Sequence, residues 1–185
     1  MERLHNSGLP FYDFILINGQ EFESNIYRIK KFAEKHKQMW TRIIGLKGRY
    51  YKLDIKGLEE LMNFIKSLNI DIKEFQIQLF EYHDNIFGGN IITNNNGVYI
   101  ELAKGTQERV SKNFLEELMI YFGKINKNGR LVFFQEQVPN KIKIIANKVL
   151  KYLKVERTKY IEGYFEFVVS AEDQIFFLDY KTSIV

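Results

Sequence analysis

One stretch near the middle of the chain constrains the fold more than any other, because its pattern predicts an antiparallel hairpin. Residues 88–93 (GGNIIT) and 97–103 (GVYIELA) are apolar or alternate in polarity, as strands do. The letters NNNG between them supply residues that tolerate the positive φ angles of a tight primed turn. A polar loop, KGTQE at residues 104–108, follows at once and is more than a bare hairpin needs.

The rest of the chain contains further helices and strands, and the strands are expected to pair mostly antiparallel. Apolar residues recur at helical spacing in residues 21–37 and 56–68, and a third helix is predicted to begin at Ser111. A fourth begins near Pro139, which suits the first turn of a helix. Further strands are predicted at residues 11–17, 38–44, 75–82, 130–134, 164–170 and 174–180. Segregated helices and antiparallel strands indicate the α+β class.

Length and composition favour a cytoplasmic protein with a substantial hydrophobic core. The chain has 185 residues, 45% of them hydrophobic, and we predict an N-terminal lobe over residues 1–75 and a C-terminal lobe over residues 76–185. No apolar run approaches the length of a membrane span, and the N-terminus lacks the apolar region of a signal peptide. The absence of cysteine excludes thiolate metal sites, and the three histidines lack a repeated ligand spacing, so zinc is not expected.

The charge of the chain is mildly basic, with a formal net charge of +4 and a pI near 9.0. Lysines gather after residue 140 on a predicted helix. The apolar residues at helical spacing there are Ile142, Ile145, Val149 and Leu153. The lysines left on the other side are Lys143, Lys151 and Lys154. This side is either an ordinary solvated face or a surface that contacts phosphates, as in a small basic domain that binds nucleic acid.

The closing hairpin carries two carboxylates that suit metal binding. A four-residue turn over residues 171–174 would set Glu166 directly opposite Asp179. Like charges opposed across a sheet destabilise it unless a cation lies between them. Mg²⁺ accepts two carboxylates when phosphate oxygens and waters complete its octahedral shell. The alternative is that both side chains face solvent, with Lys181 as a neighbouring countercharge.

Several segments form a wider pattern when they are taken in chain order. They are SGLPFYDFILI, WTRIIG, GLEELMNFIKSL, FQIQLFEY, GGNIIT, GVYIELAKGTQERVS and YFEFVVSAEDQIFFLDYKTS. In this order they resemble the nucleotide-binding domain of the phosphoenolpyruvate synthase and pyruvate phosphate dikinase family. That domain has an ATP-grasp fold, and the resemblance covers nearly the whole chain.

The resemblance implies an ATP-grasp-like α+β protein with two small lobes, which binds ATP together with Mg²⁺. Matched to the motifs of the family, Arg42 and Lys181 would contact phosphate as catalytic residues, and Gln78 would precede the hinge against adenine. Glu166 and Asp179 would bind the metal. An arginine presents a fixed fork to phosphate oxygens, whereas a lysine acts as a point charge.

The polar loop after the central hairpin also gains a role from the resemblance. In the family the matching loop ends a strand near the nucleotide cleft, which implies that Lys104 and Glu108 contact the cofactor. The residues alone allow a simpler interpretation, in which Gly105 only provides the turn into the helix that begins at Ser111.

The motifs also depart from the family pattern. Ile43 and Ile44 stand in place of two serines, Tyr164 replaces the first acidic residue of its strand, and Thr106 interrupts a glycine-rich run. The chain is expected to begin after the glycine-rich loop that carries the phosphate-binding lysine of the family. The family also passes phosphate to a swivelling histidine domain and then to pyruvate, and because neither that domain nor the pyruvate-binding domain is recognised in this sequence, a complete dikinase is not expected.

Two functions follow as expectations. The first is a minimal phosphotransferase that binds nucleotide and acts on an unknown acceptor carried by a protein partner. The second is a degenerate relative that is kept as a non-catalytic binding or regulatory module. A nucleic-acid-binding domain is a third interpretation, supported by the lysine-bearing helix and the pI.

Overall fold

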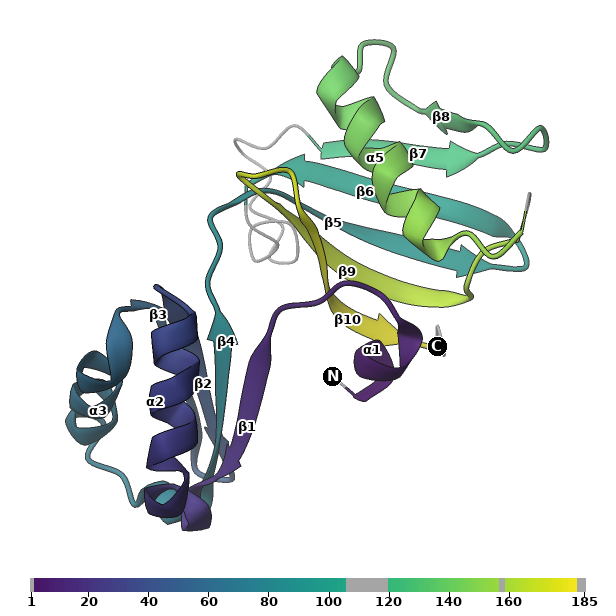
Figure 1. The fold of residues 1–185 in the computed structure, drawn as a ribbon. Coiled ribbons are helices and arrows are strands. Elements are labelled where there is room, and N and C mark those ends of the chain that lie inside the picture. Colours follow the sequence, from purple (N-terminus) through teal and green to yellow (C-terminus); the bar gives the residue numbers. More distant parts are fainter. Residues whose placement is uncertain (1, 106–119, 157–158, 183–185) are drawn as a thin grey trace. The chain divides into compact units, whose positions relative to one another are not determined.

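The protein divides into two compact units in the computed structural model (Figure 1). The structure describes residues 2–105, 120–156 and 159–182. The four-stranded unit comprises Tyr12–His83, and the six-stranded unit combines Met1–Phe11 with Asp84–Val185.

This division differs from the prediction at both ends of the expected N-terminal lobe. The first eleven residues belong to the six-stranded unit, not to an N-terminal lobe. The boundary expected after residue 75 falls instead after His83, because the strand that begins at Phe75 is an inner strand of the first sheet.

The four-stranded unit is an antiparallel sheet with the strand order β1-β4-β2-β3. Its strands are β1 (Phe14–Asn18), β2 (Met39–Gly45), β3 (Gly48–Ile55) and β4 (Phe75–Glu81). Helices α2 (Ile26–Lys35) and α3 (Gly57–Ser67) pack on one face of the sheet (Figure 1). Short 3-10 turns occupy Gly19–Glu21, Glu23–Asn25 and Ile72–Glu74. Side chains alternate between the two faces along each strand, so the residues that do not face the helices lie on the opposite face of the sheet.

Sequence periodicity predicted most of this unit correctly. Phe22, Ile29 and Phe32 form a buried stripe as expected, although the predicted helix is preceded by 3-10 turns and ends at Lys35. The edge strand β3 was not predicted. Only Ile55 is buried among its residues, so the strand lacks the apolar run by which the other strands were found.

The six-stranded unit is an antiparallel sheet with the strand order β10-β9-β5-β6-β7-β8. Its strands are β5 (Asn85–Asn94), β6 (Gly97–Lys104), β7 (Ile120–Ile125), β8 (Leu131–Phe133), β9 (Gly163–Ser170) and β10 (Ile175–Lys181). Helix α5 (Asn140–Leu153) lies across one face, and α1 (Glu2–Ser7) lies beside β10 (Figure 1).

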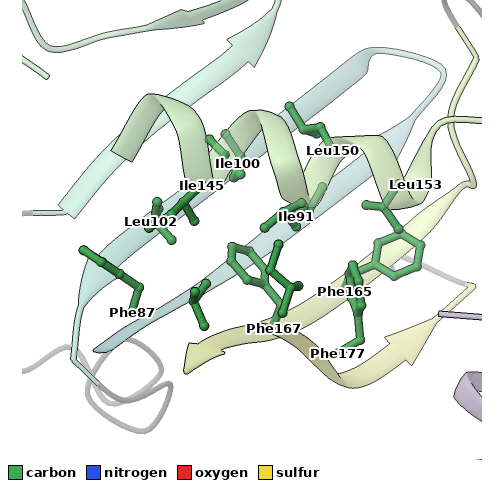
Figure 2. Close-up of a cluster of buried hydrophobic side chains, with 14 of the residues drawn as sticks. Phe87, Ile91, Ile100, Leu102, Ile145, Leu150, Leu153, Phe165, Phe167 and Phe177 are labelled. Atoms are coloured by element: carbon green, nitrogen blue, oxygen red, sulfur yellow. The ribbon is translucent and has the colours of Figure 1, made fainter. Parts of the chain in front are cut away.

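The core of this unit lies between α5 and the sheet, as Figure 2 shows. Ile145 of α5 is buried among alternate residues of the central strands, including Ile100 and Phe167. The residues that the sequence placed on the apolar side of this helix, Ile142, Ile145, Val149 and Leu153, are all buried. Lys143, Lys151 and Lys154 are exposed on the other side.

The predicted central hairpin forms, but its turn differs from the expected one. Asn94 pairs with Gly97, which leaves Asn95 and Asn96 as the turn residues. Gly97 has a φ of 135°, whereas neither asparagine of the turn has a positive φ. The primed turn expected from the letters NNNG is therefore not adopted.

The closing hairpin lies at one edge of its sheet, with β10 as the last strand. The Ser170 amide donates to the Gln174 carbonyl (2.9 Å), which closes a three-residue loop over 171–173. Asp173 in this loop has a φ of 58°, the left-handed conformation that such a loop requires. A bulge at Leu178 then shifts the register by one residue and sets Asp179 opposite Glu166. The predicted pairing is present, but the bulge produces it instead of a four-residue turn.

The N-terminal segment belongs to the six-stranded unit because its apolar residues complete that core. Leu4 and Leu9 are buried there, and the Pro10 carbonyl accepts a hydrogen bond from the Phe177 amide (2.8 Å).

Strand β7 was not predicted, because its letters continue the apolar pattern of the preceding residues. The helix expected to begin at Ser111 lies outside the described residues. Among the described helices, none combines the length and apolar composition that a bilayer crossing needs.

Candidate functional site

The face of the six-stranded sheet opposite α5 carries a row of polar side chains across four neighbouring strands. Glu101 on β6 pairs with Asn90 on β5, Asn90 pairs with Glu166 on β9, and Glu166 pairs with Asp179 on β10. These four residues, here called the acidic row, share one face because they occupy one register position. Their neighbours along each strand, such as Ile100, Phe165 and Phe167, face α5 and the core. Hydrophobic patterning therefore orients the row.

Hydrogen bonds tie the acidic row to Tyr164, the residue two before Glu166 on β9. The Asn90 amide nitrogen Nδ2 donates to Glu101 Oε2 (3.2 Å). The Tyr164 hydroxyl lies 3.1 Å from Asn90 Oδ1 and 3.0 Å from Glu166 Oε1. A hydroxyl has one proton, so these two oxygens compete for a single donor. The cluster thus offers more acceptors than donors, which favours a cation.

The electrostatics of the row act on Tyr164 directly. Burial raises the pKa of the Tyr164 phenol well above its usual value, and the nearby charges of Glu166, Glu101 and Asp179 raise this pKa further. The phenol therefore stays protonated and acts as a hydrogen-bond donor to the row.

Lys181 supplies a positive charge at the β10 end of the row. Its Nζ atom lies 3.1 Å from Asp179 Oδ2 and 5.4 Å from the centre of the Tyr164 ring. The side chain of Lys181 is 58% exposed, so water screens this ion pair and its contribution to stability is small. The predicted residues Glu166, Asp179 and Lys181 are thus brought together by two adjacent strands.

The row fits an oxygen-preferring cation only in combination with other ligands. Carboxylate and amide oxygens are the ligands that Mg²⁺ prefers. In the described part of the chain, no group of three or more His, Cys, Asp or Glu side chains could hold a metal ion. A metal at this row would need further oxygens from water or from a bound phosphate, as is usual for Mg²⁺.

Arg42 and Gln78 lie together on the other unit. They are paired across β2 and β4, on the face opposite α2 and α3. The Arg42 guanidinium lies 5.7 Å from the ring centre of Trp40, which stacks on Phe80 with 4.1 Å between ring centres. The Gln78 amide nitrogen donates to Gln76 Oε1 (2.9 Å). The Arg42 guanidinium lies 5.9 Å from the ring centre of Phe80 as well, so it sits beside both rings, within the range of cation–π attraction.

The structure does not bring Lys104 to the acidic row. Lys104 is the last residue of β6, and it follows Glu101 by three residues. The alternation of the strand places it on the face of Ile100 and Leu102, which is the α5 face. Gly105 has a φ of 109°, and its amide donates to the carbonyl of Ile86 on β5, whereas the residues of the expected turn that follow it lie outside the described residues. Glu108 lies outside the described residues.

A second polar cluster joins residues that are far apart in the sequence of the four-stranded unit. His36 Nε2 lies 2.8 Å from Asp13 Oδ2, and His36 Nδ1 lies 3.4 Å from Glu81 Oε2. His83 Nε2 lies 3.4 Å from the same Glu81 oxygen. Burial of Asp13 opposes its ionisation, but hydrogen bonds from Lys35 and His36 outweigh this and lower its pKa. His36 and His83, which are far apart in the sequence, thus meet carboxylates after folding.

Sequence reasoning missed Asn90, Glu101 and the hydroxyl of Tyr164 as members of the site. The signal for the first two was present in the central hairpin. A two-residue turn between Asn94 and Gly97 fixes a register in which Asn90 faces Glu101. Tyr164 was noticed only as a departure from a family motif, whereas its hydroxyl links the two halves of the row.

Comparison with known proteins identifies the fold. No protein-family model matches the chain, and no curated protein matches it in sequence. The chain is similar in structure to D-alanyl-alanine synthetase A from Vibrio cholerae, with a TM-score of 0.51 and 11% identity over 98% of this chain and 53% of that one. A RiPP-associated ATP-grasp ligase from Chryseobacterium gregarium gives a TM-score of 0.53 and 14% identity over 100% of this chain and 50% of that one. An N5-carboxyaminoimidazole ribonucleotide synthetase gives 0.50 and 13%, over 100% and 43%.

These similarities show that the chain has an ATP-grasp-like α+β fold, as the sequence predicted. The similar structures are ligases, so they support the ATP-grasp fold in general and not the phosphoenolpyruvate synthase and pyruvate phosphate dikinase family in particular. The chain spans about half the length of the solved structures that it matches.

Proposed function

We propose that the protein binds an adenine nucleotide together with Mg²⁺, on the face of its six-stranded sheet that carries the acidic row. The acidic row carries this proposal. Three carboxylates and an amide occupy one register position, and Lys181 is the cation that lies against them. Like charges aligned across a sheet cost stability, so a bound cation would offset that cost. The ATP-grasp-like fold supports a nucleotide as the second ligand, since two of the similar structures are complexes with ADP.

Each candidate residue has a defined role in this proposal. Glu166 and Asp179 hold Mg²⁺ through carboxylate oxygens, and Glu101 and Asn90 orient Glu166 through the Tyr164 hydroxyl. When bound, Mg²⁺ would neutralise charge on the nucleotide phosphates. Lys181 adds a point charge for a phosphate oxygen.

Within the four-stranded unit, the residues that the family resemblance assigns to nucleotide are Arg42 and Gln78. We propose that Arg42 contacts phosphate, because its guanidinium is held beside the Trp40 and Phe80 rings by cation–π attraction. Gln78, which lies on β4 and pairs with Arg42 on β2, would contact the base. Lys104 and Glu108 remain candidates for the cofactor site only through the family resemblance, and the alternation of β6 weakens the case for Lys104.

A phosphotransferase reaction would require an acceptor from a partner. We propose a protein partner for this role, because the similar ligase from Chryseobacterium gregarium is a complex with a leader and core peptide. In such a reaction the γ-phosphoryl group leaves ATP for an acceptor oxygen or nitrogen, and ADP remains. A non-catalytic binding module is the second candidate. It is favoured by Ile43, which replaces a family serine and is fully buried against the helices.

Binding is tested by thermal unfolding of the protein with ATP, with ADP and with each nucleotide plus Mg²⁺. A ligand that binds only the folded state stabilises it by about 2.7 kcal/mol at a hundredfold excess over its Kd. We expect ATP with Mg²⁺ to raise the melting temperature more than ATP with EDTA. A flat response to millimolar nucleotide would reject the proposal.

Two variants separate metal binding from structural roles. Glu166→Gln and Asp179→Asn should leave the melting temperature without ligand unchanged or slightly raised, because each removes repulsion within the row. Both should abolish the Mg²⁺-dependent part of the ATP response. Glu162→Gln, at an exposed carboxylate just before β9, is the matched control and should keep that response. If the Mg²⁺ effect survives in both row variants, the metal site does not lie at the acidic row.

A further inference from the structure

The outer side of α5 is a strongly basic surface that the proposed nucleotide site does not use. The helix contains four lysines and no acidic residue. It covers the face of the sheet opposite the acidic row, so a partner on the outer side of α5 would leave the row open. Lys148 is engaged by the Asp173 carbonyl, and Lys141 lies 3.7 Å from the Asp173 carboxylate. No described carboxylate pairs with the ammonium group of Lys143 or Lys151.

This surface is hollowed as well as charged. A shallow groove of about 600 Å³, here called the α5 groove, is lined by Asn140, Lys143, Ile144, Asn147, Lys148 and Lys151. Ile144 is 66% exposed in it, whereas the adjacent Ile145 is 4% exposed. The lysines that line the groove with Ile144 are exposed, and such side chains present apolar alkyl stems below their charged ends. The floor of the groove is therefore apolar and its rim is positive.

The α5 groove continues toward the edge of the sheet. A second hollow of about 340 Å³ shares Lys143 and Asn147 with it and is lined by residues of β8, including Leu131 and Phe133. Strand β8 is the last strand at this end of the described sheet. Together the two hollows would accommodate an extended segment that crosses from α5 to β8.

We propose that the α5 groove binds an acidic segment of a partner protein, in which apolar side chains alternate with carboxylates. The carboxylates would meet the ammonium groups of Lys143 and Lys151, and an apolar side chain would cover Ile144. A nucleic acid fits less well for two reasons. Residues 140–154 contain no arginine to fork onto phosphate, and a phosphate backbone has no apolar group for the floor of the groove. This proposal is independent of nucleotide binding.

Fluorescence anisotropy with the full chain tests the proposal. The probe is a labelled twelve-residue peptide of alternating glutamate and leucine, and the reference peptide has glutamine in place of every glutamate. We expect the acidic peptide to bind and the glutamine peptide to bind at least tenfold more weakly. The affinity should fall as NaCl rises from 50 to 300 mM, because exposed charges are screened. No binding of the acidic peptide at millimolar concentration would overturn the proposal.

Variants locate the site and separate charge from shape. The double variant Lys143→Glu with Lys151→Glu should weaken peptide binding at least tenfold. The control Lys66→Glu with Lys73→Glu makes the same charge change on exposed lysines of the other unit and should stay within twofold. Ile144→Ser should weaken binding several-fold although it changes no charge. An Ile144→Ser variant that binds normally, or a twelve-residue oligothymidine that binds as tightly as the acidic peptide, would show a general polyanion surface and contradict the proposal.

Discussion

At the scale of single residues, Tyr164 is the most informative side chain of the candidate site. Its hydroxyl is the donor that links Asn90 to Glu166. Its ring also lies beneath the Lys181 ammonium group. The raised pKa of this phenol has burial as its largest cause and the three carboxylates as the next. Tyr164 therefore stays neutral, and its pKa responds to the charge of the acidic row.

The pH dependence of stability should reveal this environment. The folded-state pKa of Tyr164 is raised above the usual value of 10.0, so the folded protein holds this proton more tightly than the unfolded chain does. The stabilising effect is complete below pH 10 and is lost as the pH rises above it, because only the unfolded chain then ionises. We expect Tyr164→Phe to lose less unfolding free energy than the wild type between pH 9 and pH 11, by about 1 kcal/mol after solvent screening.

Urea denaturation at pH 7, 9, 10 and 11 measures this difference. At pH 7 the variant should be less stable by about 1 kcal/mol, because Glu166 and Asn90 lose a donor. Equal alkaline losses in the two proteins would mean that the pKa of Tyr164 is not raised in the folded protein.

At the level of single residues, the sequence predicted correctly which two carboxylates face each other across the closing hairpin. Glu166 and Asp179 were paired correctly, yet the pairing depends on a bulge at Leu178 that no turn rule announces. Lys104 was assigned through a family motif, and strand alternation sets it on the other face from Glu101. Side-chain alternation is thus a stricter guide to a site on a sheet than motif order is.

At the scale of elements, strongly periodic segments were predicted well and weakly patterned ones were missed. Helix α5 was found with its buried side correctly assigned, because four apolar residues recur at helical spacing over three turns. Strands β3 and β7 were missed. The first has almost no buried residue, and the second follows an apolar run that concealed its alternation.

Two neighbouring isoleucines of α5 make a matched test of this element. Ile145 is buried beneath the helix, so Ile145→Ala should lower the free energy of unfolding by about 3 kcal/mol through lost burial and a residual cavity. Ile144 is exposed, so Ile144→Ala should change it by less than about 0.5 kcal/mol. Equilibrium unfolding in urea measures both. Comparable losses in the two variants would contradict the assigned orientation of the helix.

At the scale of the whole molecule, the order of the segments predicted the ATP-grasp-like fold better than any single motif did. Ordering survives sequence change because the fold needs each element in its place, whereas motif residues depend on the particular ligand. For this physical reason, the order of the segments predicted the fold, whereas the motif residues did not identify the particular family. The division of the chain was also missed, because residues 1–11 join the six-stranded unit through Leu4 and Leu9, a long-range contact that local patterns do not encode.

Each unit has a hydrophobic core of its own, so each should respond to damage separately. Gly19 and Gly89 provide matched positions for this test. A Cβ at Gly19 would lie 1.8 Å from the Ile72 carbonyl oxygen, within the four-stranded unit. A Cβ at Gly89 would lie 2.2 Å from the Glu101 carbonyl oxygen, within the six-stranded unit. Backbone atoms cannot move aside cheaply, so Gly19→Ala and Gly89→Ala should each cost at least about 2 kcal/mol in the unit concerned.

Hydrogen exchange followed by mass spectrometry reads the two units independently. Gly19→Ala should accelerate exchange in peptides from residues 12–83, and peptides from residues 84–105 should keep their wild-type protection. Gly89→Ala should give the reverse pattern, so each variant is the control for the other. If either substitution accelerates exchange equally in both sets of peptides, the units unfold as one cooperative body. A ligand that stabilises one unit would then protect the other equally, and the response to ATP with Mg²⁺ could not be assigned to the sheet that carries the acidic row.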